Sequence, residues 1–177
     1  PTATVTATMT PTPTQTATPS GSASVYISEF LADPSAVSDT AGEWIELFNA
    51  GPDGVNLRGW TLADLGSDSH TIIDDLFVAA NSYVVLARNG DFAENGGVLA
   101  RYIYTGITLA NTEDEIILIR PDGTPEHSVA WGGTSPLRIS RGKSLERTDF
   151  STTIWATAIT AWFGSAGDFG TPGSAYV

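Results

Sequence analysis

The sequence predicts an all-β domain of the sandwich or barrel type, preceded by an extended arm rich in threonine and proline. Short runs of β-branched and aromatic residues recur between residues 25 and 148, and turn residues separate them. No amphipathic helix of three turns is visible along the chain. Many short strands joined by regular turns are typical of a β-sandwich or barrel. We therefore expect an arm or linker over residues 1–23 and one β domain over residues 24–177.

The arm alternates threonine with other residues at a period of two. Side chains of an extended chain point alternately to two faces, so the arm would carry one threonine face and one mostly apolar face. Tracts of Ser or Thr with Pro are typical of O-glycosylated stalks on secreted and surface proteins. We therefore expect O-linked glycans and an extracellular or cell-surface location. The candidate acceptors are Thr2, Thr4, Thr6, Thr8, Thr10, Thr12, Thr14, Thr16 and Thr18.

The first half of the arm also suits pairing with a β-sheet. Residues 3–9 contain no proline, so they could donate a full ladder of backbone hydrogen bonds to an open sheet edge. The docking face would consist of Ala3, Val5, Ala7 and Met9. The prolines at 11, 13 and 19 favour polyproline II, which suits a spacer. Eighteen extended residues reach about 60 Å, beyond the roughly 40 Å diameter of such a domain, so the arm could reach a second copy.

The strands follow the linker at residues 19–24. Each expected strand is a run of β-branched or aromatic residues, and glycine-containing turns at 51–54, 89–90, 95–97 and 121–123 supply positive φ. The expected strands cover residues 25–31, 43–49, 60–64, 69–73, 82–88, 114–120, 126–131 and 144–148.

The first two expected strands are apolar on both faces, which is unusual for half-buried sandwich strands. In the second, Trp44 and Phe48 flank Glu46 on the face opposite Ile45 and Leu47. Either a loop or the C-terminal segment of the chain covers this second face, or another chain does. In the second case the candidate arm-accepting face consists of Tyr26, Phe30, Trp44 and Phe48.

The order of these segments resembles the lamin tail domain family over nearly all of residues 25–175. The segments that carry the resemblance are ISEFLADP at 27–34, GEWIELFN at 42–49, VNLRGWTL at 55–62, YVVLARN at 83–89, LAN at 109–111, DEIIL at 114–118 and GTPGSA at 170–175. The resemblance implies an immunoglobulin-like β-sandwich without catalytic residues. Bacterial members are commonly modules of secreted or surface proteins. The chain has neither a coiled-coil rod nor a basic localisation run, so the resemblance implies nothing nuclear.

The charge of the chain disfavours nucleic-acid partners. Lys and Arg total 8 against 20 Asp and Glu, and the formal net charge is −12. Nucleic-acid binders are usually basic or carry a basic stripe. We interpret the one basic run, Arg138, Arg141, Lys143 and Arg147, as a solvated strand face. No stretch approaches the length of a transmembrane helix, so we expect no direct membrane insertion.

The residues that could carry chemistry are few. The chain has no cysteine, and its two histidines, His70 and His127, lie in no catalytic motif, so we expect no catalytic residue and no enzyme. We also expect no cofactor, although a structural calcium ion could bind the acidic residues of the first two strands and their loop. The weak candidates are Glu29, Asp33, Glu43 and Glu46. A solvated acidic rim is the simpler interpretation.

Three functional hypotheses remain open. The first is a non-catalytic extracellular structural subunit, with the arm linking identical subunits head to tail into a glycosylated filament. The second is an accessory or anchoring module of a larger secreted hydrolase or nuclease, and the start at Pro1 leaves room for a removed signal peptide or a larger precursor. The third is a carbohydrate-binding module that uses exposed rings among Trp131, Trp155, Trp162, Tyr102 and Tyr104, although we expect each of these to be core.

Overall fold

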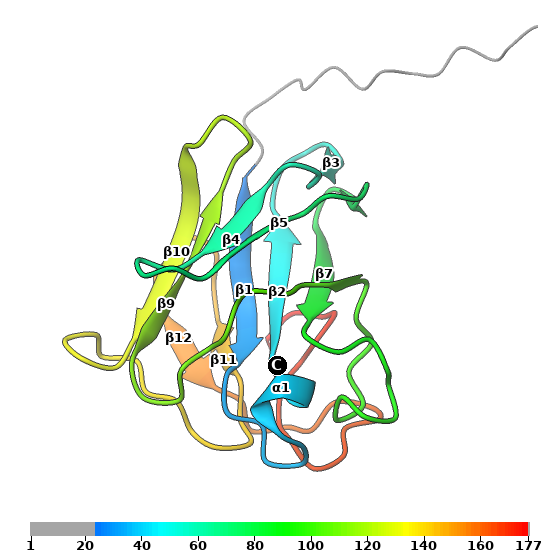
Figure 1. Cartoon of the computed structure of the whole chain (residues 1–177), viewed down its shortest axis with the longest axis vertical. Helices are drawn as coiled ribbons and strands as arrows, with labels where there is room; N and C mark the ends of the chain where they lie inside the picture. The colour runs from blue at the N-terminus through cyan, green and yellow to red at the C-terminus, as the bar shows by residue number, and fades with distance from the viewer. Residues whose placement is uncertain (1–23, 177) are drawn as a thin grey trace, which may run out of the picture.

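The computed structural model describes residues 24–176, which form two β-sheets packed face to face (Figure 1). The strands are β1 (Val25–Leu31), β2 (Trp44–Asn49), β3 (Val55–Asn56), β4 (Thr61–Ala63), β5 (Ser69–Thr71), β6 (Phe77–Val78), β7 (Ser82–Ala87), β8 (Tyr102–Ile103), β9 (Asp114–Ile119), β10 (Pro125–Trp131), β11 (Leu145–Arg147) and β12 (Trp155–Thr157). The one helix of the described region is the single turn α1 (Asp39–Gly42). The immunoglobulin-like β-sandwich expected from the sequence is confirmed.

The larger sheet has six strands in the order β12-β11-β1-β2-β7-β8, and the smaller sheet has four in the order β10-β9-β4-β5. Strands β3 and β6 form a separate two-stranded ribbon. All pairings are antiparallel except that of β7 with β8, which is parallel. The late strand β11 pairs with β1, so the two ends of the domain meet in the middle of one sheet.

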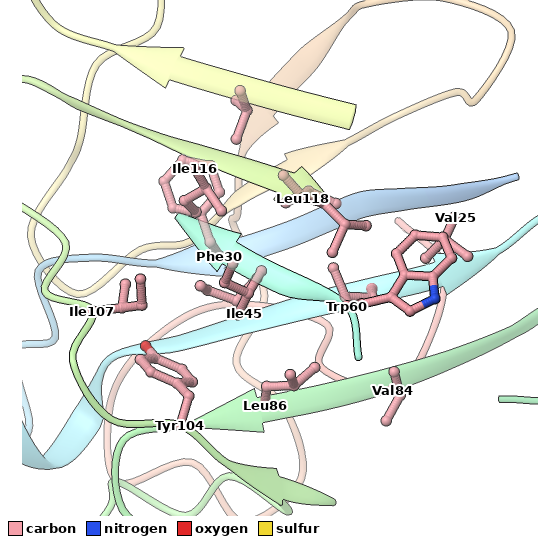
Figure 2. Close-up of a cluster of buried hydrophobic side chains, with 14 of the residues drawn as sticks. Val25, Phe30, Ile45, Trp60, Val84, Leu86, Tyr104, Ile107, Ile116 and Leu118 are labelled. Carbon is pink, nitrogen blue, oxygen red and sulfur yellow. The ribbon is translucent and has the colours of Figure 1, made fainter. Parts of the chain in front are cut away.

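The main core lies between the two sheets (Figure 2). The larger sheet contributes Phe30, Ile45 and Leu86, and the smaller sheet contributes Leu62 and Leu118, all completely buried. Alternation along each strand produces this arrangement, because every second side chain points to the same face. The ring of Phe30 packs on that of Trp131, with centroids 4.7 Å apart, and on that of Trp155 at 5.7 Å.

A second hydrophobic cluster lies on the opposite face of the larger sheet. It consists of Leu31, Trp44, Val85, Ala87 and Val98, with Trp162 of the C-terminal segment packed against it. The indole ring of Trp162 meets that of Trp44 edge-on at 6.1 Å, and its Nε1 donates a hydrogen bond to the carbonyl of Gly97 at 2.8 Å. The C-terminal segment of the chain itself therefore covers the second apolar face of β1 and β2.

This cover corrects the expectation of one open aromatic face. Phe30 and Trp44 have no exposed surface, because the former lies in the main core and the latter lies under Trp162. Tyr26 and Phe48 are half-buried, and both contact Phe150. A β-bulge between Ile27 and Glu29 also shifts the alternation of β1, so that Tyr26 and Phe30 do not share a face. The four residues do not form a continuous docking surface.

Candidate functional site

Three glutamates lie side by side on the covered face of the larger sheet. They are Glu29 of β1, Glu46 of β2 and Glu146 of β11, and the register places Glu29 opposite both of the others. Their exposed fractions are 1%, 1% and 3%. Strands β11, β1 and β2 are neighbours in the sheet, and this adjacency brings together residues more than a hundred positions apart in the chain. We call these three residues the carboxyl cluster.

The carboxyl cluster is covered by residues 170–174 of the C-terminal segment. The backbone N–H of Thr171 donates to Glu29 Oε1 at 2.9 Å, and that of Gly173 donates to Glu46 Oε2 at 2.5 Å. The Thr171 hydroxyl lies 3.2 Å from Glu29 Oε2 and 3.1 Å from Glu146 Oε1. A Cβ added at Gly170 would lie 2.6 Å from Glu29 Oε1, so a larger residue would require the Glu29 carboxyl to move.

Two serines also donate hydrogen bonds to the carboxyl cluster. The hydroxyl of Ser28 donates to Glu46 and that of Ser144 donates to Glu29, both at 2.6 Å. Because buried polar groups are costly without partners, these bonds compensate in part for the removal of the carboxyls from water.

Burial raises the pKa values of the carboxyl cluster, so these glutamates keep their protons to a higher pH than exposed glutamates do. Burial, followed by the nearby Glu46, raises the pKa of Glu29 to about 9, and burial followed by the charge of Glu146 raises the pKa of Glu46 to about 8. Burial also raises the pKa of Glu146. Such an acid could in principle donate a proton in catalysis. The cavity beside the cluster measures only about 10 Å³, however, which is room for one water molecule and not for a substrate.

An arginine and a histidine lie next to the carboxyl cluster among aromatic rings. The guanidinium of Arg147 stacks 4.7 Å from the centre of the Tyr26 ring, and its Nη1 lies 2.7 Å from His127 Nε2. The other ring nitrogen of His127 accepts a hydrogen bond from the N–H of Ile27 at 3.2 Å. Burial and then Arg147 lower the pKa of His127 to about 4. The imidazole is therefore neutral at physiological pH, and it accepts one hydrogen bond, because its other nitrogen carries a proton.

Glu43 forms a separate buried ion pair. Its Oε2 accepts hydrogen bonds from Arg88 Nη1 at 3.0 Å and from the N–H of Leu109 at 3.2 Å. Its Oε1 and the hydroxyl of Tyr104 are buried and have no hydrogen-bond partner among residues 24–176. Burial raises the pKa of Glu43 to about 7, against the opposing effects of the Leu109 N–H and Arg88.

The structure does not bring the four calcium candidates together. Glu29 and Glu46 belong to the carboxyl cluster, Glu43 pairs with Arg88, and Asp33 lies 4.0 Å from Arg141 Nε. Within the described part of the chain, no group of three or more His, Cys, Asp or Glu residues could hold a metal ion. The acidic rim proposed as the simpler interpretation is also not present at Glu29, Glu43 and Glu46, because these side chains are buried.

The remaining candidate residues serve packing. His70 contacts the Tyr102 hydroxyl at 3.0 Å and accepts a hydrogen bond from the N–H of Thr105 at 3.2 Å. Trp131 and Tyr104 are buried, and Trp155 and Trp162 are half-buried against Phe30 and Trp44. Arg147, which the sequence placed on a solvated face, is 7% exposed.

The arm threonines and the docking face Ala3, Val5, Ala7 and Met9 lie outside the described residues.

Comparison with known proteins identifies the family. The family model described as Lamin Tail Domain matches residues 18–133, about two thirds of the chain. The chain belongs to the lamin tail domain family. None of the curated proteins compared with the chain matches it.

The matched range of the lamin tail domain ends before β11. Strands β1 to β10 lie inside it, whereas β11, β12 and the segment that covers the carboxyl cluster follow residue 133. The lamin tail domain is a non-catalytic, immunoglobulin-like family. Glu146, Thr171 and the edge strand β12 thus lie outside the matched residues.

No helix between residues 24 and 176 is long and apolar enough to span a membrane.

Proposed function

We propose that this lamin tail domain chain is a non-catalytic structural subunit of an extracellular filament, joined to the next subunit through an O-glycosylated N-terminal arm. The observation that carries the proposal is the placement of threonine at every even position from Thr2 to Thr18, with no proline between Ala3 and Met9. Such a period of two is the repeat of a strand, and a strand needs a sheet to pair with.

The tight packing around the carboxyl cluster supports a structural role. The carboxyl cluster, the most polar buried site, has its hydrogen bonds satisfied by the fold and opens onto a cavity of only about 10 Å³. Binding sites for small molecules usually measure several hundred Å³. The interactions described above therefore serve to stabilise the sandwich.

The gains and costs of arm binding are similar in size. Burying Val5 and Met9 would contribute about 3–6 kcal/mol, and ladder hydrogen bonds would add about 1 kcal/mol each. Ordering seven residues costs about 7–14 kcal/mol. These quantities nearly cancel, so residues that stiffen the arm matter. Prolines and glycans reduce the freedom of the free arm, and they therefore favour binding.

Sedimentation analysis tests the proposal. The full chain and a version lacking residues 1–19 are compared over a range of concentrations, after expression in a host that glycosylates threonine. We expect the full chain to form large species and the shortened chain to stay a monomer. A monomeric full chain at every concentration would contradict the proposal, and mass spectrometry of the arm peptide reports separately on the glycans.

A further inference from the structure

The two sheets of the sandwich have four edge strands, β5, β8, β10 and β12. Strand β8 is very short, and residues of β5 and of the first half of β10 already bond to other parts of the domain. At β5, the N–H of Ser69 donates to the carbonyl of Gly106. At β10, the side chains of Glu126 and His127 accept hydrogen bonds from the first residues of β1, and Pro125 opens the strand. Strand β8 consists of two residues. These edges offer little room for an additional strand.

Strand β12 is the exception. The N–H of Thr148 bonds to the carbonyl of Ile154, and the N–H of Ala158 bonds to that of Ser144. In an antiparallel pair the bonded positions alternate, so Ala156 faces β11 while the backbone groups of Trp155 and Thr157 face outward. No other strand of the described region pairs with β12. Two donors and two acceptors therefore point away from the sheet.

The sequence around β12 lacks the usual protection of an edge. Natural edge strands carry lysine, proline or inward-pointing charges that prevent pairing with another chain. Residues 150–167 contain neither proline nor any charged residue. Ile154 and Ile159 flank the strand and are 60% and 72% exposed. The segment is uncharged and includes several β-branched and aromatic residues, which favours the addition of a strand.

The electrostatics of the whole chain favour one occupant for this edge. Two copies of a protein with a net charge of −12 repel each other over most of their surfaces. The arm and residues 150–167 are both uncharged, so this pair of segments can meet without that repulsion. The chain preceding Ser24 is also long enough to reach a neighbouring molecule.

We propose that the outer edge of β12 accepts residues 3–9 of the arm of a second copy, which adds a seventh strand to the larger sheet. This inference rests on the proposed filament function and specifies its contact surface. Val5 and Met9 would pack near Ile154 and Ile159, and the outward backbone groups of Trp155 and Thr157 would bond to the arm.

Cysteine cross-linking tests the contact directly, since the chain contains no cysteine of its own. One full-length version carries Ala156→Cys, and a second carries one cysteine in the arm, at Ala3, Val5 or Ala7 in turn. Relative to an added strand, position 156 is a non-hydrogen-bonded site, where Cα atoms approach to about 4.5 Å, within reach of a disulfide. The two versions are mixed and oxidised. The control replaces Ala156→Cys with Ser128→Cys on the exposed side of β10.

We expect the yield of mixed disulfide to be at least about tenfold higher with Ala156→Cys than with Ser128→Cys, for at least one arm position. Equal yields at the two edges, or no mixed disulfide with Ala156→Cys at any arm position, would overturn the inference. Because the two cysteines reside on different chains, only a contact between copies gives this product.

A charge placed on the edge separates this inference from the filament proposal. We expect Ile154→Lys with Ile159→Lys to reduce the polymerised fraction at least about tenfold at an unchanged melting temperature. The control pair, Leu65→Lys with Leu99→Lys, alters side chains that are 82% and 78% exposed elsewhere, and it should have no effect. If the parent chain polymerises and the chain with Ile154→Lys and Ile159→Lys does so equally, the arm binds elsewhere and only the proposed contact at β12 fails. If the parent chain stays monomeric, both fail.

Discussion

The carboxyl cluster is the residue-scale feature with the clearest consequence, because it changes how stability depends on pH. The pKa values of Glu29 and Glu46 are raised in the folded state, to about 9 and about 8. The folded chain therefore binds more protons than the unfolded chain above pH 4.5. Stability from these groups is fully present below that pH and is lost as pH rises through 8 and 9.

We predict that the free energy of unfolding falls between pH 6.5 and pH 9. His127 contributes little in this window, since its pKa is lowered to about 4 in the folded state and the unfolded chain loses this proton near pH 6.5. Each bound proton is worth about 1.4 kcal/mol per pH unit, so the fall should be on the order of 4 kcal/mol. Urea unfolding at several pH values measures it. A constant or rising stability over this range would show that the buried carboxyls are ionised.

Substitution of Glu29→Gln should reduce this pH dependence. The amide keeps an acceptor for Ser144 and for the N–H of Thr171, and its NH₂ group can donate to the Thr171 hydroxyl. It has no proton to lose, so the fall between pH 6.5 and 9 should be roughly halved. Glu113→Gln is the matched control at an exposed position and should leave the slope unchanged. An unaltered slope in Glu29→Gln would remove Glu29 as the source.

The ion pair of Glu43 predicts a second effect that depends on pH. In Arg88→Met, Glu43 loses its only cationic partner among the described residues while remaining completely buried. We expect a cost of about 3–5 kcal/mol at pH 9, where the carboxyl must be charged. At pH 5 the cost should be smaller, because Glu43 can take up a proton. Thermal unfolding at both pH values tests this, and an equal cost would contradict it.

The sequence indicates some of the buried charged residues but not their role. It grouped Glu29, Glu43 and Glu46 as acidic residues near one loop, and the pattern of β2 did place Glu46 between Trp44 and Phe48. A carboxyl among aromatic residues on one strand face was the available signal for burial. Glu146 and Arg147 could not be assigned, because their partners Glu29 and His127 are set by tertiary pairing.

At the scale of elements, local pattern predicted the long strands and missed the short ones. Each of the eight expected ranges contains a strand, and the expected 25–31 coincides with β1. Strands β3, β6 and β8 have two residues each, too few for alternation to be visible. Strand β12 lies in a segment rich in Thr, Ala and Gly, and its pairing with β11 defines it more than its own residues do.

The covering C-terminal segment predicts a stability effect of its own. Trp162→Ala removes the edge-on contact with Trp44 and the hydrogen bond to Gly97, so we expect a loss of about 2–3 kcal/mol in the free energy of unfolding. Phe163→Ala is the control on the next residue, whose side chain is fully exposed, and it should change stability by less than about 0.5 kcal/mol. Similar effects of the two substitutions would indicate that the segment does not stabilise the sheet.

At the scale of the whole molecule, the structure shows what covers the second apolar face of β1 and β2. Its own C-terminal segment covers the second face, so assembly does not require a partner there. All charged side chains lie after residue 23, so the net charge of −12 belongs to the globular part. What the sequence could not predict is where an arm would bind, since an open edge is a property of the sheet order.

Electron microscopy tests whether the arm joins copies of this lamin tail domain into a filament. The full chain is imaged beside a version lacking residues 1–19, both from a host that glycosylates threonine. We predict filaments with a regular subunit repeat from the full chain alone, and dispersed particles from the shortened one. Dispersed particles from both would rule out assembly through the arm and would favour the arm as a linker to another domain.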